Sequence, residues 1–274
     1  MIAPGAATAS GFGTLTYRAH GPVSLPVDGE GTVNASCRPD SHVLGGGQFV
    51  QAGFRNALVH SSAPFDGPDA DEFPDDGWRS RVDSFNGAHN TVTEYAICST
   101  RQPRYRKDSF VTSDLFLSIQ SVGCPAGDTV LGGGLDISPE YNSGYVLASA
   151  PGRWRPRTAW RSDAFVGFNA MNQRVTAWAI CGAAEVIYRR ATGEVADQGS
   201  GRASAACPAA TRLIGGGVRV SLPDPRNSTD LAPTIFSPVD GRDGDLAPDD
   251  RWQVEADDLD SIGGQVEATA VCIS

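Results

Sequence analysis

Apolar and polar residues alternate along most of this chain, which is the pattern of strands that bury one face. The pattern is clear over residues 91–98 and again over residues 174–181. Runs rich in Val, Thr and aromatic residues are separated by clusters of Gly, Pro, Asp and Asn, which predicts about six strands in each third of the chain. The sequence therefore predicts an all-β protein.

The same markers occur three times, about 85 residues apart. Each copy has a Tyr, a Cys followed by three consecutive glycines, a Pro-containing segment, a Trp and a closing strand that ends in Cys. The glycine triplets are residues 45–47, 132–134 and 215–217, and the tryptophans are Trp78, Trp160 and Trp252. Self-similarity of this kind predicts three copies of one antiparallel β unit. We name them repeat 1 (14–98), repeat 2 (99–181) and repeat 3 (182–274), which follow an N-terminal tail (1–13).

The links between repeats are short. Six residues separate Cys98 from Tyr105, and six separate Cys181 from Tyr188, which is too few for independent units on flexible tethers. The repeats must therefore touch, either in a body with pseudo-threefold symmetry or in a row. The sequence favours the closed body, because it hides strand edges that a row would leave exposed.

Six cysteines permit fifteen pairings, and the repeat selects one of them. A framework repeated three times should pair within each copy. The predicted disulfides are Cys37–Cys98, Cys124–Cys181 and Cys207–Cys272. Each closes a loop of roughly sixty residues and stabilises the fold by about 4 kcal/mol in the chain-entropy model. Persistent disulfides need an oxidising compartment, which predicts a secreted or cell-surface protein, and a zinc or redox site is disfavoured because the chain has no Cys-x-x-Cys.

Three consecutive glycines weaken a strand, so their recurrence indicates a steric need for bare backbone. Two structural interpretations remain open. Either the Trp of the same repeat lies across the glycines, or the three glycine strands crowd together near a pseudo-threefold axis. A phosphate cradle is disfavoured, because the triplets lack the following helix and the Gly-Lys-Ser/Thr ending. The tryptophans are correspondingly interpreted as core residues, with ligand platforms as the alternative.

The chain has 22 basic and 32 acidic residues, for a formal net charge of −10, which disfavours nucleic acid as a partner. No apolar run approaches the roughly 18–20 residues that cross a bilayer, so we expect no membrane span.

Because shared positions build the scaffold, we looked for function where the copies diverge. The segment before the Trp is acidic in repeats 1 and 3 but basic and aromatic in repeat 2. The ligand-binding residues predicted from it are Arg153, Trp154, Arg155 and Arg157. An indole between guanidinium groups suits a sugar, a carboxylate-bearing polymer or an acidic protein. Alternatively, Trp154 packs on a neighbouring repeat while the arginines pair with the acidic segments.

The acidic segments suggest calcium as the one candidate cofactor, because Ca²⁺ takes six to eight oxygen ligands. The predicted metal ligands are Asp240, Asp243 and Asp245, with Asp69, Asp71 and Asp75 as a poorer set. Neither set matches the EF-hand pattern, and solvated loops without a metal are the simpler interpretation.

No catalytic residues are predicted, because the chain has no Gly-x-Ser-x-Gly elbow and its four histidines do not recur at equivalent positions. The leading functional prediction is a secreted, non-enzymatic recognition module that binds carbohydrate or another extracellular surface through loops at one end. Two alternatives stay open. One is a structural or assembly subunit, such as a coat, fibre-tip or toxin-complex component, and the other is a hydrolase with a carboxylate pair. The oligomeric state is not predicted.

The pattern Cys-Pro-x-Gly, Gly-Gly-Gly, Trp and Ala-Ile-Cys, seen from Cys124 to Cys181, resembles a repeat of uncharacterised secreted proteins of actinobacteria. The resemblance covers nearly the whole chain from Tyr17 to Ser274 and implies secretion and a repeat architecture, but no activity. Repeat 1 departs from it by placing Arg38 before its Pro. At the level of architecture, three antiparallel units around one axis resemble the β-prism of several lectins and an egg-membrane protein.

Overall fold

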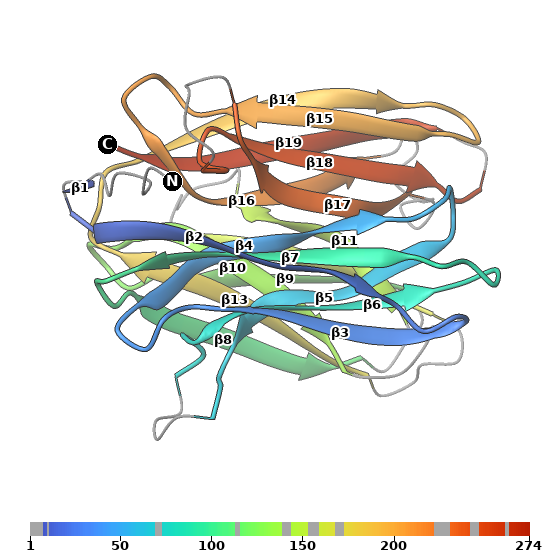
Figure 1. The fold of residues 1–274 in the computed structure, drawn as a ribbon, viewed down its shortest axis with the longest axis horizontal. Coiled ribbons are helices and arrows are strands. Elements are labelled where there is room, and N and C mark those ends of the chain that lie inside the picture. Colours follow the sequence, from blue (N-terminus) through green and yellow to red (C-terminus); the bar gives the residue numbers. More distant parts are fainter. Residues whose placement is uncertain are drawn as a thin grey trace.

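The computed structural model describes residues 8–9, 11–68, 73–112, 116–138, 144–152, 159–167, 173–221, 231–241, 247–260 and 263–274. The described residues form β-strands and contain no helix, as predicted (Figure 1). In particular, none of them belongs to a helix that is long and apolar enough to cross a membrane.

Each repeat supplies six strands. Repeat 1 contains β2 (Gly13–Ser24), β3 (Gly29–Ser36), β4 (His42–Gln51), β5 (Ala57–Phe65), β6 (Gly77–Ser84) and β7 (Thr91–Ser99), preceded by β1 (Thr8–Ala9). Repeat 2 contains β8 (Arg104–Val111), β9 (Phe116–Gly123), β10 (Thr129–Ile137), β11 (Gly144–Pro151), β12 (Ala159–Val166) and β13 (Arg174–Gly182). Repeat 3 contains β14 (Val186–Val195), β15 (Ser200–Ala206), β16 (Arg212–Ser221), β17 (Leu231–Val239), β18 (Arg251–Asp258) and β19 (Gly264–Ile273).

The six strands of one repeat form two three-stranded layers that pack face to face. In repeat 1 the layers have the orders β2-β7-β4 and β3-β6-β5. The equivalent layers are β8-β13-β10 and β9-β12-β11 in repeat 2, and β14-β19-β16 and β15-β18-β17 in repeat 3. One side of each layer faces its partner layer, which is why outer strands such as β15 alternate, whereas β5, β11 and β17 at the junctions between repeats are buried at nearly every position.

Neighbouring repeats share their sheets. β5 of repeat 1 pairs with β10 of repeat 2, β11 of repeat 2 pairs with β16 of repeat 3, and β17 of repeat 3 pairs with β4 of repeat 1. The result is two antiparallel sheets of six strands and one of seven, which includes β1. This exchange is cyclic, so it confirms the pseudo-threefold body, and the buried clusters draw on all three repeats. The sheets are not closed, because each still ends in two edge strands.

The first glycine of each triplet lies where the three repeats meet. A Cβ on Gly45 would come within 2.7 Å of the Ile214 carbonyl oxygen, and one on Gly132 would clash with the Leu44 carbonyl oxygen. A Cβ on Gly215 would lie 3.1 Å from the Leu131 carbonyl oxygen, which is tight but not forbidden. Real Cβ atoms essentially never approach other heavy atoms closer than 3.0 Å, so the crowding of backbones at the axis requires glycine at positions 45 and 132.

The other two glycines have different neighbours. A Cβ on Gly133 would lie 2.5 Å from Cγ of Trp160, and the second glycine of each triplet meets the Trp of its own repeat in the same way. A Cβ on Gly217 would lie 2.5 Å from the Ser149 carbonyl oxygen, and the third glycine of each triplet faces such a carbonyl across the junction between repeats. Both structural interpretations of the triplets are therefore confirmed, each for a different glycine.

The tryptophans are core residues, with exposed fractions of 2% for Trp78 and 0% for Trp160 and Trp252. Trp78 Nε1 donates a hydrogen bond to Ser62 Oγ at 2.8 Å, and the equivalent bond in repeat 2 measures 2.9 Å. In repeat 3 the serine position holds Phe236, and Trp252 Nε1 has no hydrogen-bond partner in the described part of the chain.

Three tyrosines connect the repeats in a second ring. Each hydroxyl donates at 2.7 Å to a carbonyl oxygen of the preceding repeat, beside the β-bulge at which the register of the glycine strand shifts. The pairs are Tyr17–Leu213, Tyr105–Val43 and Tyr188–Val130. These bonds cap bulge carbonyls that the strand ladder leaves unpaired.

The three predicted disulfides are confirmed as Cys37–Cys98, Cys124–Cys181 and Cys207–Cys272. Phe12 belongs to the N-terminal tail, but it is only 2% exposed and lies beside Gly182, which ends β13, and in one buried cluster with Leu131 of repeat 2. This ring is buried because it covers apolar surface that repeat 2 exposes at the end of its core.

We expect Gly133→Ala to destabilise the protein by about 1–3 kcal/mol or more, because the added methyl overlaps the Trp160 ring. Gly123→Ala is the matched control, because a Cβ there meets no atom within 4 Å. Urea unfolding should show a lower midpoint for the first variant and a nearly unchanged one for the second. Equal midpoints would contradict the close packing of Trp on glycine.

Candidate functional site

The ligand-binding residues predicted from the basic segment, Arg153, Trp154, Arg155 and Arg157, lie outside the described residues. Of the predicted calcium ligands, Asp243 and Asp245 also lie outside them, as do Asp69 and Asp71 of the poorer set. Asp240 is described and exposed, and it joins no described group of three metal-ligating side chains. Both sites thus stay predictions.

The acidic residues nearest the tryptophans have structural partners. Asp75 is 4% exposed, and its Oδ2 lies 2.5 Å from His42 Nδ1. The equivalent Asp249 is 3% exposed and pairs with Arg212 Nη1 at 2.5 Å. In both repeats the carboxylate therefore fixes the start of the glycine strand.

A groove of about 440 Å³ lies on the sheet that repeats 1 and 2 share. Its walls come from β5 and β6 of repeat 1 and from β8, β10 and β13 of repeat 2. Aromatic and cationic side chains line it in pairs. The Arg79 guanidinium lies 4.6 Å from the centroid of Phe65, and Lys107 Nζ lies 5.2 Å from the centroid of Trp178. Phe73, which is 53% exposed, adds a further ring.

An ion pair holds one lining residue of this groove, Asp136, in place across the junction between repeats 1 and 2. Arg81 Nη2 of repeat 1 lies 2.6 Å from Asp136 Oδ1 of repeat 2. The Asp136 side chain is 41% exposed and lines the groove, so it keeps acceptor capacity toward a ligand. The groove thus combines aromatic faces, two cations and two carboxylates, since the exposed Asp66 lines it as well.

The residues at the equivalent positions of the other two repeats differ. The cross-strand pair of Trp178 and Lys107 corresponds to Tyr95 and Ala19 in repeat 1 and to Thr269 and Arg190 in repeat 3. Within the described residues, an aromatic ring and a cation occur together in this pair only in the groove between repeats 1 and 2. The three repeats are therefore chemically distinct at this pair of positions.

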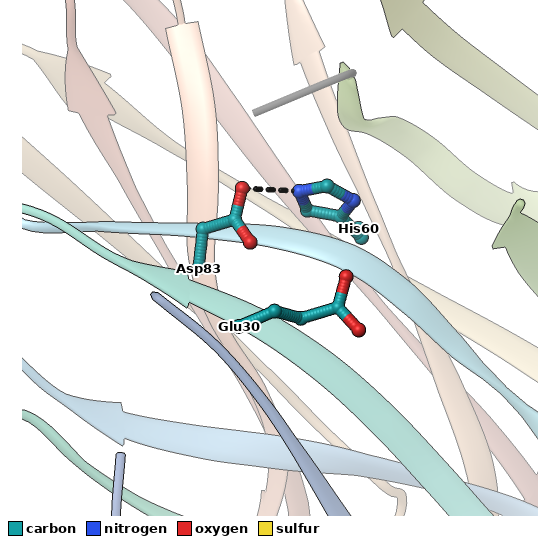
Figure 2. A group of neighbouring side chains, drawn as sticks. All are labelled: Glu30, His60 and Asp83. Carbon is teal, nitrogen blue, oxygen red and sulfur yellow. Dashed lines mark hydrogen bonds and ion pairs between the residues drawn. The ribbon is translucent and has the colours of Figure 1, made fainter. Parts of the chain in front are cut away.

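A second polar cluster occupies the same layer of repeat 1. Glu30, His60 and Asp83 come from the adjacent strands β3, β5 and β6, and Figure 2 shows their side chains converging. Glu30 and Asp83 face each other as cross-strand partners, and His60 is brought beside them by the register shift between Val59 and Ser61.

The cluster is compact and mostly buried. His60 Nε2 lies 2.5 Å from Asp83 Oδ2, and one ligand atom from each of the three residues lies within 4.8 Å of the others. His60 and Asp83 are 0% exposed, whereas Glu30 is half-buried. Among the described residues, His60 Nδ1 has no hydrogen-bond partner. Because His60 and Asp83 are buried, they are better placed to bind an ion than to act as catalytic groups on a polymeric substrate.

The other repeats replace this cluster. Repeat 2 has Leu117, Leu147 and Phe165 at the equivalent positions, and repeat 3 has Ser200, Thr234 and Asp257. The repeat 2 residues include members of an apolar cluster. In repeat 3, Asp257 accepts hydrogen bonds from the Ser200 hydroxyl at 2.6 Å and the Arg55 backbone N–H at 2.9 Å. The scaffold itself does not need a His with two carboxylates.

Repeat 1 also buries a polar group inside its core. Ser80 Oγ lies 2.9 Å from both Glu94 Oε1 and Gln48 Oε1, and all three residues are 0% exposed. Burial raises the pKa of Glu94 well above its usual range, against a smaller opposing effect of the Ser80 hydrogen bond. The Ser80 hydroxyl faces both acceptors and donates its single proton to one of them at a time. Repeats 2 and 3 have Ala177 and Ala268 at the position of Glu94.

Searches against protein-family models and against curated protein sequences found no match for this chain.

Sequence reasoning missed both the groove and the His60 cluster. The available signal was divergence, since Trp178, His60 and Glu94 each differ in type from their counterparts in the other repeats. The segments before the tryptophans differ more conspicuously between repeats, because their net charge changes sign.

We expect Glu94→Gln to stabilise the protein at pH 7 by more than about 1 kcal/mol. With its pKa raised, native Glu94 keeps a proton that the unfolded chain loses above pH of about 4.3, so wild-type stability falls as the pH rises from that value. The gain should vanish at pH 4, where Glu94 is largely protonated in both states. Urea unfolding at both pH values measures the difference in free energy of unfolding between the variant and the wild type. Glu185→Gln, at an exposed position, is the control. A gain that is the same at both values would refute this account.

Proposed function

We propose that this protein is a secreted, non-enzymatic recognition module that binds carbohydrate in the groove between repeats 1 and 2. The observation that carries the proposal is the paired aromatic and cationic lining of this groove, because the equivalent cross-strand pairs of repeats 1 and 3 do not combine a ring with a cation. Three disulfides support an oxidising, extracellular setting.

The lining suits a sugar for two reasons. Trp178 and Phe73 offer apolar ring faces against which the C–H groups of a pyranose can pack. Lys107, Arg79 and Asp136 surround them with donors and an acceptor for hydroxyl groups, and the two cations also accommodate a carboxylate. A glycan needs this mixture, whereas an apolar peptide would leave the charged groups unpaired.

The test is a glycan array with neutral and acidic polysaccharides, followed by calorimetry on the best ligand. Trp178→Thr introduces the residue that repeat 3 carries at this position, so the fold should tolerate it. We expect binding to weaken at least about tenfold. Tyr95→Thr, the same change at the equivalent position of repeat 1, should leave the affinity unchanged. Absence of glycan binding, or equal effects of the two changes, would refute the proposal.

A second candidate is an assembly subunit that pairs through the edge strand β9. Leu117 and Ile119 are 39% and 48% exposed on this strand, and the other repeats have Thr32 and Arg202 at the position of Ile119. Exposed apolar residues on an edge favour pairing with the same edge of a second copy.

Light scattering after size-exclusion chromatography tests this candidate. We expect a wild-type dimer and an Ile119→Arg monomer, because a second copy would bury the new charge. A monomeric wild type would exclude pairing through β9.

A further inference from the structure

We propose that Glu30, His60 and Asp83 form a binding site for one divalent transition-metal ion, with Zn²⁺ as the fitting probe (Figure 2). The three side chains supply one imidazole nitrogen and two carboxylates from adjacent strands of a rigid layer. One nitrogen and two oxygens within 4.8 Å of one another match a three-ligand zinc site that leaves a fourth position for water.

Charge supports a cation at this place. Two carboxylates converge on one imidazole, and both Asp83 and His60 are fully buried. Buried negative charge is unfavourable unless it is compensated, and a divalent cation compensates both carboxylates at once. The equivalent residues of repeat 2 are apolar, so burial alone does not explain why repeat 1 keeps these groups.

The geometry requires only a small adjustment. Zinc binds such ligands at about 2.0–2.1 Å, which places two ligands of a tetrahedral ion about 3.3 Å apart. His60 Nε2 and Asp83 Oδ2 are 2.5 Å apart, so the ion replaces one hydrogen bond and separates the two groups by less than about 1 Å. Half-buried Glu30 gives the ion a route from solvent and supplies the third ligand.

The donor set discriminates between metals. An imidazole ligand suits zinc and its neighbours, whereas Ca²⁺ takes six to eight oxygen ligands, and this cluster offers two carboxylates. The site therefore differs in place and in chemistry from the calcium site predicted around Asp240.

The experiment measures zinc in untagged protein that has been treated with EDTA and dialysed against Zn²⁺, together with calorimetric titration and melting temperature. We expect about one equivalent of zinc and a melting temperature that rises with its concentration. His60→Leu and Glu30→Ser carry the residues of repeats 2 and 3, and each should weaken binding by about 100-fold or more, since each removes a ligand. If His60→Leu fails to fold, Glu30→Ser at the half-exposed position still gives the test.

Two controls make the result specific. His42→Thr removes the other His–Asp pair, which belongs to no described group of three ligands, and it should bind zinc like the wild type. Trp178→Thr should do so as well, which separates this proposal from glycan binding. Wild type that takes up no zinc, that prefers Ca²⁺, or that loses zinc with His42→Thr but not with Glu30→Ser would overturn the site.

Discussion

The close approach of three backbones at the pseudo-threefold axis is the constraint on which the structure depends. Each glycine strand passes so near its two counterparts that Gly45 and Gly132 cannot carry a Cβ. The next glycine admits the Trp of the same repeat, and the third admits the strand of the neighbouring repeat. One triplet therefore sets the contact at the axis, the packing within a repeat and the junction between repeats.

Strand exchange follows from this arrangement. Because β4, β10 and β16 converge, each is placed beside a strand of another repeat and completes a sheet with it. The tyrosine bonds and the continuous core then make the three repeats one cooperative body. Substitutions elsewhere are absorbed more easily, as Phe236 shows by replacing the serine that bonds to Trp in the other repeats.

Much of the fold could be predicted from sequence, because alternation and repetition are local signals. The strands, the pairing of Cys124 with Cys181 and the need for bare glycine backbone all follow from them. The exchange of strands could not be derived, because the same alternation is satisfied by a row of separate units. The sites were still harder to predict. Glu30, His60 and Asp83 become neighbours only through the pairing of three strands and a bulge, and no spacing in the sequence records that contact.

The cyclic exchange of strands carries an evolutionary consequence. A lone repeat would expose two unpaired inner strands, and three identical chains would satisfy them by forming a ring with exact rotational symmetry. Such a homotrimer must present the same surface three times. In a single polypeptide this restriction does not apply. Each interface between repeats can therefore carry different side chains while the backbone packing at the axis stays the same.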